Sequence, residues 1–165
     1  ENPTATAEVS AYGWHHTGDI GYLDDEGYLY LTDRRHHMII SGGENVYCAE
    51  VENVLAAHPS IAEVAVIGRP DERWGEVPVA VVALDAGAAG VGGTGLALAD
   101  VEEFLTDRLA RYKHPKALEV VEALPRNPAG KVLKTELRER FGAAAHVAVR
   151  ESSSASTASV DDGGA

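Results

Sequence analysis

Cysteine and long apolar runs are both scarce in this sequence. The 165 residues include a single cysteine, Cys48, which cannot form a disulfide within the chain and so fits a reducing cytosol. No apolar run approaches the roughly 20 residues that a membrane-spanning helix needs. The N-terminus also lacks the basic-then-apolar pattern of a signal peptide. We therefore expect a cytoplasmic protein without a membrane span.

Positive charge is scarce as well. Lys and Arg together number 14 against 26 Asp and Glu, which gives a formal net charge of -12 at pH 7. Nucleic acids and anionic membranes are bound by basic faces, so this balance argues against both as partners. An anionic ligand must instead be bound by a few cations placed against the average negative charge.

The signatures of several enzyme classes are missing too. No GxSxG motif surrounds Ser10 or Ser41, and "NPAGKVL" lacks both the leading Gly and the Ser or Thr of a Walker sequence. The adjacent His36 and His37 would point to opposite faces of a strand, and no Cys or carboxylate cluster completes a metal site. The chain therefore offers charged side chains but no nucleophile, no phosphate-binding loop and no expected metal.

Short strand and helix patterns alternate along the chain. A hairpin is predicted over residues 21–33 around "DDEG", and a strand with a Gly-Gly turn is predicted over 37–47. Strand patterns cover 61–70, 77–84 and 117–124, and helical patterns begin at 48, at about 99 and at 134. The first dozen residues show no clean period. We expect an α+β fold of the α/β sandwich kind, with a small mixed sheet flanked by helices and roughly 100 compact residues.

Two other stretches are predicted to lack regular structure. Residues 85–95 form a Gly/Ala-rich sequence that favours a flexible loop, and the Ser-rich tail from Ser152 has too few apolar residues to build a core.

The stretch "LPRNPAGKVLK", residues 124–134, places a lysine behind residues that restrict the backbone. Pro125 and Pro128 each fix a φ angle, and Gly130 can adopt conformations that other residues avoid. Two interpretations stay open on these residues alone. Lys131 is either a solvated lysine at the tip of a surface hairpin, or a charge that a loop delivers into a site made elsewhere.

Asp19 and the pair Gly42-Gly43 are also ambiguous. Asp19 follows Gly18 just before a predicted strand. Its carboxylate suits a cis-diol such as ribose, but the same residue type also closes Asx turns. Adjacent glycines let backbone N–H groups approach a ligand, and they equally suit a tight hairpin.

Three segments in this order resemble the adenylate-forming superfamily, over about residues 1–141: "GWHHTGDIGYLDDEGYLYLTDR", "MIISGGENVYCAEVE" and "LPRNPAGKVLK". That family includes acyl-CoA synthetases, peptide-synthetase adenylation domains and firefly luciferase. The "MIISGGENVY" segment is most similar to fatty-acyl and aryl CoA ligases. The resemblance implies a C-terminal lid domain whose parent enzyme makes an acyl-adenylate from a carboxylate and ATP, and then an acyl-CoA.

The resemblance also implies roles for single residues. Lys131 would be the adenylation lysine, which contacts the acyl carboxylate and the α-phosphate. Asp19 would bind the ribose hydroxyls of ATP, and Arg34 would assist at the ribose and phosphate. The domain would then rotate about a hinge at His36, where relatives commonly have Asp or Lys, so its behaviour is expected to depend on pH.

After this rotation, Gly43 and Glu44 would line the pantetheine tunnel for CoA. Trp74 and the segment 112–115 match places where relatives contact the CoA nucleotide. His114 stands there in place of the Arg of many relatives.

The resemblance further implies a partner, an N-terminal adenylation domain that carries the phosphate loop, the acyl pocket and the magnesium-binding Glu. Residues 1–33 resemble the last strands of that domain, 34–145 form the C-terminal domain, and 146–165 a disordered tail. The implied ligands are ATP or AMP, a carboxylic acid and CoA, and the chain alone is expected to be inactive. Two alternatives remain: an adenylation domain that charges a carrier protein, and a non-catalytic relic or binding module.

Overall fold

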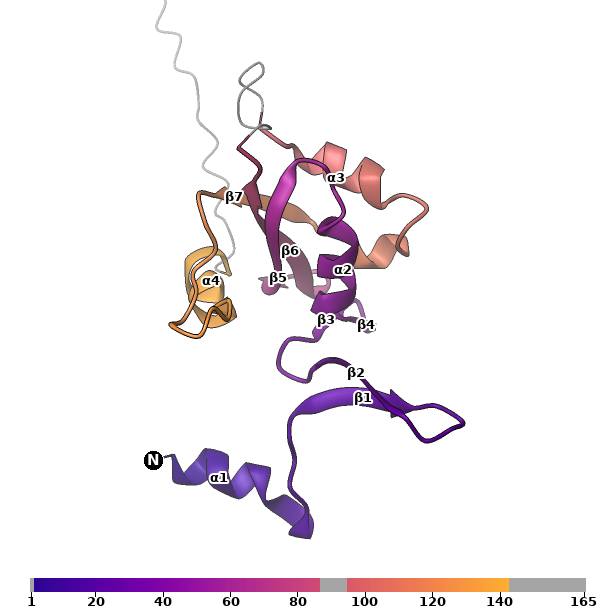
Figure 1. The fold of residues 1–165 in the computed structure, drawn as a ribbon, viewed down its shortest axis with the longest axis vertical. Helices are drawn as coiled ribbons and strands as arrows, with labels where there is room; N and C mark the ends of the chain where they lie inside the picture. The colour runs from indigo at the N-terminus through magenta and orange to yellow at the C-terminus, as the bar shows by residue number, and fades with distance from the viewer. Residues whose placement is uncertain (1, 87–94, 143–165) are drawn as a thin grey trace, which may run out of the picture.

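The computed structural model describes residues 2–86 and 95–142 (Figure 1). The helices are α1 (Pro3–Val9), α2 (Cys48–Leu55), α3 (Leu98–Leu105) and α4 (Lys134–Phe141), with short 3-10 turns at Ala11–Gly13 and Arg111–Lys113. The strands are β1 (Asp19–Leu23), β2 (Leu29–Arg34), β3 (Ile39–Ser41), β4 (Glu44–Val46), β5 (Ile61–Asp71), β6 (Gly75–Leu84) and β7 (Ala117–Val121).

Strand β6 is the centre of a five-stranded mixed sheet. It pairs with β5 in antiparallel register from Ile61 opposite Leu84 to Asp71 opposite Gly75, and with β7 in parallel register. It also meets β3, which carries β4 at the sheet edge. The Val-rich run from Val77 to Ala83 is buried at every position. A continuous apolar run of this kind belongs to a strand that is covered on both faces.

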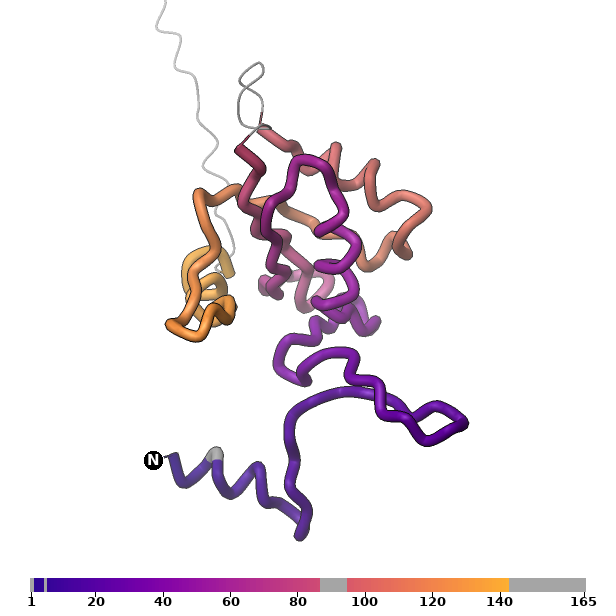
Figure 2. Tube along the Cα trace, viewed as in Figure 1, coloured from indigo at the N-terminus to yellow at the C-terminus, as the bar shows by residue number. Residues whose placement is uncertain are grey.

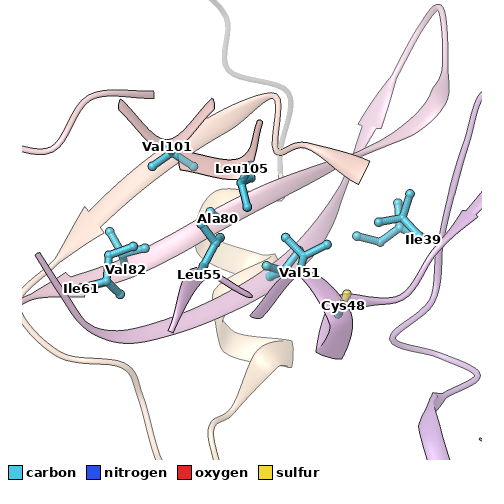
Figure 3. Close-up of a cluster of buried hydrophobic side chains, with 11 residues drawn as sticks. Ile39, Cys48, Val51, Leu55, Ile61, Ala80, Val82, Val101 and Leu105 are labelled. Atoms are coloured by element: carbon cyan, nitrogen blue, oxygen red, sulfur yellow. The ribbon is translucent and has the colours of Figure 1, made fainter. Parts of the chain in front are cut away.

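The two faces of the sheet hold two separate apolar clusters. On one face α2 and α3 contribute Val51, Leu55, Val101 and Leu105, which pack with Ala80 and Val82 of β6 (Figure 3). The residues between them in β6, Val79 and Val81, point to the other face and pack with Leu137 of α4. This division follows the period of two in a strand. Three helices are thereby fixed to one sheet.

The N-terminal part forms a separate hairpin and helix beside this body (Figures 1 and 2). Strands β1 and β2 pair only with each other in the described residues. Asp33, near the end of β2, accepts the Ala49 N–H at 3.2 Å at the start of α2. This hydrogen bond ties the hairpin to the sheet region.

The α+β fold with its mixed sheet and flanking helices is confirmed, and so are the hairpin, the three later strands and the three later helices. Helix α1 was not predicted. Its sequence "PTATAEV" has no apolar stripe, and apart from Val9 its described side chains are exposed. The predicted loop over 85–95 lies mostly, and the tail from Ser152 wholly, outside the described residues.

Candidate functional site

Lys131 lies near the tip of a short hairpin loop after β7. The Leu133 N–H donates to the Pro125 carbonyl at 2.8 Å, and the Asn127 N–H donates to the Lys131 carbonyl at 2.9 Å. The Asn127 side-chain oxygen accepts the Lys131 N–H at 2.9 Å, and Gly130 adopts the positive φ of 80° that turns the chain. The loop therefore has a defined shape. Lys131 itself is exposed and forms no ion pair with any residue in the described ranges.

Asp19 and Arg34 are brought together at the open end of the β1–β2 hairpin, where they are register partners. The Arg34 Nε atom lies 3.0 Å from Asp19 Oδ1. The Asp19 N–H donates to the Thr17 hydroxyl at 3.2 Å, so Thr17 and not Asp19 supplies the turn-closing side chain. The Asx-turn alternative for Asp19 is therefore wrong. Its second carboxylate oxygen accepts no hydrogen bond from the described residues.

His36 lies in the turn that joins β2 to β3. The His36 carbonyl accepts a hydrogen bond from Arg138 Nη2 of α4 at 3.0 Å. The rings of His36 and His37 are in edge contact, with centroids 4.5 Å apart. The expectation that they point to opposite faces of a strand is wrong, because both residues belong to a turn.

His37 has the most perturbed environment of this turn. Burial lowers the pKa of its imidazole from 6.5 to about 4, with a further contribution from the positive charge of Lys134. Its Nδ1 atom lies 3.8 Å from Asp33 Oδ1, which opposes this shift. His37 is therefore neutral in the folded protein at pH 7.

The Gly42-Gly43 turn joins β3 to β4 beside Trp74. A Cβ atom on Gly42 would lie 2.7 Å from the Trp74 ring, and the Gly42 N–H donates to the Trp74 carbonyl at 2.8 Å. A Cβ atom on Gly43 would meet no atom within 4 Å, although its φ of +88° favours glycine. Glu44 is exposed at the start of β4. The structure thus brings Gly43, Glu44 and Trp74 to one corner.

His114 is held inside the protein rather than presented to solvent. It is 7% exposed, and its Nε2 atom lies 3.1 Å from the Leu109 carbonyl oxygen. It forms part of the wall of a cleft of about 480 Å³ at the end of α3, which is also lined by the cations Arg111 and Lys116 and by the carboxylates Glu102, Glu103 and Asp107. Neither of these two exposed cations was singled out from the sequence, where the segment 112–115 with His114 was named instead.

In residues 2–86 and 95–142, no three or more His, Cys, Asp or Glu side chains form a group that could hold a metal ion. None of the helices in these ranges has the length and apolar character of a membrane-spanning segment.

The sequence matches one family model and is similar to several known ligases. The model of the AMP-binding enzyme C-terminal domain matches residues 50–131. The long-chain-fatty-acid–CoA ligase FadD13 of Mycobacterium tuberculosis is 52% identical over 141 residues, which are 86% of this chain and 27% of the ligase. The fatty acid–acyl-carrier-protein ligase ScoC of Streptomyces coeruleorubidus is 47% identical over 84% of this chain and 26% of its own length.

The fold of this chain is also similar to part of a solved ligase structure. The o-succinylbenzoate CoA synthetase of Bacillus subtilis, in complex with its acyl-adenylate intermediate, superposes with a TM-score of 0.71 at 42% identity, covering 84% of this chain and 27% of that one. The chain thus spans about a quarter of the length of the relatives that it matches.

Proposed function

This chain belongs to the adenylate-forming superfamily as an AMP-binding enzyme C-terminal domain, and we propose from this that it is the mobile lid of an ATP-dependent acyl-CoA synthetase. The reaction has two steps. A carboxylate attacks the α-phosphorus of ATP and releases pyrophosphate, and the thiol of CoA then displaces AMP from the acyl-adenylate. The single observation that carries the proposal is Lys131, a cation on a hydrogen-bonded loop of an otherwise acidic chain that forms no ion pair with the described residues.

In the first step, Lys131 stabilises the negative charge that gathers between the carboxylate and the α-phosphate. A positioned charge of this kind lowers a barrier most when it needs no reorganisation, and the Asn127 hydrogen bonds hold the Lys131 backbone in place. The Asp19 carboxylate binds the ribose hydroxyls through its free oxygen, while Arg34 holds the other oxygen at 3.0 Å and offers charge to the phosphate.

In the second step, the domain rotates about the turn at His36. Lys131 leaves the site and the corner of Gly43, Glu44 and Trp74 enters to line the thiol path. The open space at Gly43 supports this role, because a side chain there would project into solvent-filled space and not into the protein. Near His114, we propose that Arg111 and Lys116 supply the cations for the CoA phosphates, since the imidazole is already engaged by the Leu109 carbonyl.

The rest of the enzyme completes the site. We propose that residues 1–33 belong to the N-terminal adenylation domain, 34–145 to the lid and 146–165 to a tail. The N-terminal domain supplies the acyl pocket and the magnesium ligand. The buried single cysteine supports the cytosol as the compartment.

The test uses the chain alone and the chain fused behind the N-terminal part of FadD13. Pyrophosphate release with ATP and a panel of carboxylic acids should stay at background for the chain alone, because it spans only about a quarter of the length of the ligases it matches, and should appear in the fusion. An inactive fusion that is folded by its melting curve would oppose the proposal.

A carrier protein is the second candidate acceptor, since ScoC is named a ligase for acyl-carrier protein. The active fusion is therefore offered CoA and a phosphopantetheinylated carrier protein in parallel. We expect faster thioester formation with CoA, and the opposite preference would favour the carrier-protein function.

A further inference from the structure

We propose that Arg126 and Glu63 are positioning residues for Lys131. They form a brace that runs from the sheet to the backbone carbonyl immediately before the lysine. The role in catalysis rests on the proposed function of Lys131, whereas the brace itself is a property of this chain and is testable without any activity.

One guanidinium makes both contacts of the brace. Arg126 Nη2 lies 2.5 Å from Glu63 Oε1 on β5, and Arg126 Nη1 donates to the Gly130 carbonyl at 2.7 Å. Glu63 Oε2 accepts the Leu124 N–H at 3.4 Å, at the other end of the loop. A single carboxylate on the sheet therefore holds the start of the loop directly and its tip through Arg126.

The other hydrogen bonds of the loop do not connect it to the sheet. Those made by Asn127, and the bridge between Arg126 and Val132, join loop residues to each other. They fix the shape of the hairpin but not its orientation on the sheet. The Leu124 side chain is buried and Val132 packs against the same apolar cluster, which anchors the base of the loop. The Glu63–Arg126 pair is the polar contact that connects β5 to the Gly130 carbonyl at the tip of the loop.

Arginine suits this position better than lysine does. The planar guanidinium donates hydrogen bonds to two acceptors at once through its two terminal nitrogens, and a lysine ammonium does not reproduce that geometry. The hydrogen bond from Arg126 is also the main reason why the pKa of Glu63 lies below its ordinary 4.5. The pair is partly exposed, with 42% of the Arg126 side chain and 34% of the Glu63 side chain accessible. Exposed ion pairs contribute little to global stability, so a purely structural role predicts almost no effect of breaking it.

The experiment measures loop order in the chain itself. Backbone ¹⁵N relaxation is recorded for Gly130 and Lys131 in the wild type and in the variants Arg126→Lys, Arg126→Ala and Glu63→Gln. We expect order parameters to fall from about 0.85 to below about 0.6, with melting temperatures nearly unchanged. Glu119→Gln is the matched control, because it breaks another Arg–Glu contact of the same sheet, between Arg69 and Glu119 at 3.6 Å.

The kinetic arm uses the FadD13 fusion. Arg126→Lys should slow adenylate formation by about 10- to 100-fold, because small misplacements of a reacting group have effects of this size. Thioester formation from supplied acyl-adenylate should change little, and Glu119→Gln should leave both steps unchanged.

The possible failures are distinguishable. Unchanged order parameters in Arg126→Ala and Glu63→Gln would overturn the brace. A looser loop with normal adenylation, while Lys131→Ala is inactive, would overturn the positioning role. Normal adenylation in Lys131→Ala would instead refute the proposed function and leave the brace to be judged by relaxation alone.

Discussion

The β5–β6 pair and the β1–β2 hairpin are both built from apolar residues, yet they differ completely in burial. All residues from Val77 to Ala83 of β6 are buried, whereas Leu23, Leu29 and Leu31 of the hairpin are 67%, 63% and 66% exposed. The first pair has helices on both faces, whereas neither apolar cluster of the described residues includes a residue of the hairpin. Apolar composition alone therefore does not decide which strands form a core.

The hairpin is held by few contacts of its own. Tyr22 and Tyr30 stack across the strands with ring centroids 5.2 Å apart, and Asp19 pairs with Arg34 at one end. A two-stranded hairpin with such contacts is marginally stable in water. The apolar side chains of the hairpin therefore add little to the core of the described residues.

The largest difference between the two regions is expected from leucine truncation. Leu55→Ala removes a fully buried side chain and should lower the free energy of unfolding by about 2–5 kcal/mol. Leu31→Ala, in the exposed hairpin, should change it by less than about 0.5 kcal/mol. Urea unfolding followed by circular dichroism measures both. Equal losses in the two variants would show that the hairpin is part of the same core.

A second difference is expected in the response to acid at the turn between the regions. The pKa of His37 in the folded protein is about 4 against 6.5 for an ordinary histidine, mainly because the ring is buried. The unfolded chain therefore takes up the proton first, and stability present above pH 6.5 is lost as the pH falls toward 4. The loss attributable to His37 should reach about 2–3 kcal/mol.

The measurement compares urea unfolding of the wild type and His37→Gln between pH 7.5 and pH 4.5. Glutamine is a polar side chain of similar size that takes up no proton in this pH range, so the free energy of unfolding of the variant should fall less between pH 7.5 and pH 4.5. Parallel curves for the two proteins would contradict the assignment to His37.

The smallest of these differences is expected between two ion pairs. Lys134 Nζ lies 2.6 Å from Glu52 Oε1, with 12% and 21% of the two side chains exposed, whereas 47% of the Arg34 side chain is exposed in its pair with Asp19. Lys134→Met should lower the free energy of unfolding by about 1–2 kcal/mol, and Arg34→Met by less than about 1 kcal/mol. Thermal or urea unfolding gives both values. A larger loss in Arg34→Met would mean that the hairpin pair is structurally more important than its exposure indicates.

The same contrast explains what was predictable from the sequence. Strands β5 and β6 are Val-rich runs, and α2 carries Val51, Val54 and Leu55 at helical spacing. Local sequence patterns were therefore sufficient to predict these three elements. Helix α1 has no such pattern and was missed. The turn residues around Lys131 likewise predicted a stiff loop, because Pro and Gly restrict or permit backbone angles locally.

Contacts between distant segments were not predictable in this way. Glu63 and Arg126 are 63 residues apart, and no periodicity links them. The contact of Gly42 with the Trp74 ring also depends on the pairing of β3 with β6. The burial of His114, too, follows from how the loop after α3 folds back on the sheet.

The most direct test of the central claim is the rate of each half-reaction in the FadD13 fusion carrying Lys131→Ala. Adenylate formation, followed by pyrophosphate release, should fall by at least about 100-fold, since positioned charges are worth a few kcal/mol in the transition state. Thioester formation from supplied acyl-adenylate should stay within about twofold, because the lysine has then left the site. Arg140→Ala removes another exposed cation, to which no part of the site is assigned, and should leave both half-reactions unchanged. Equal damage to both steps by Lys131→Ala, or no damage to either, would contradict the account.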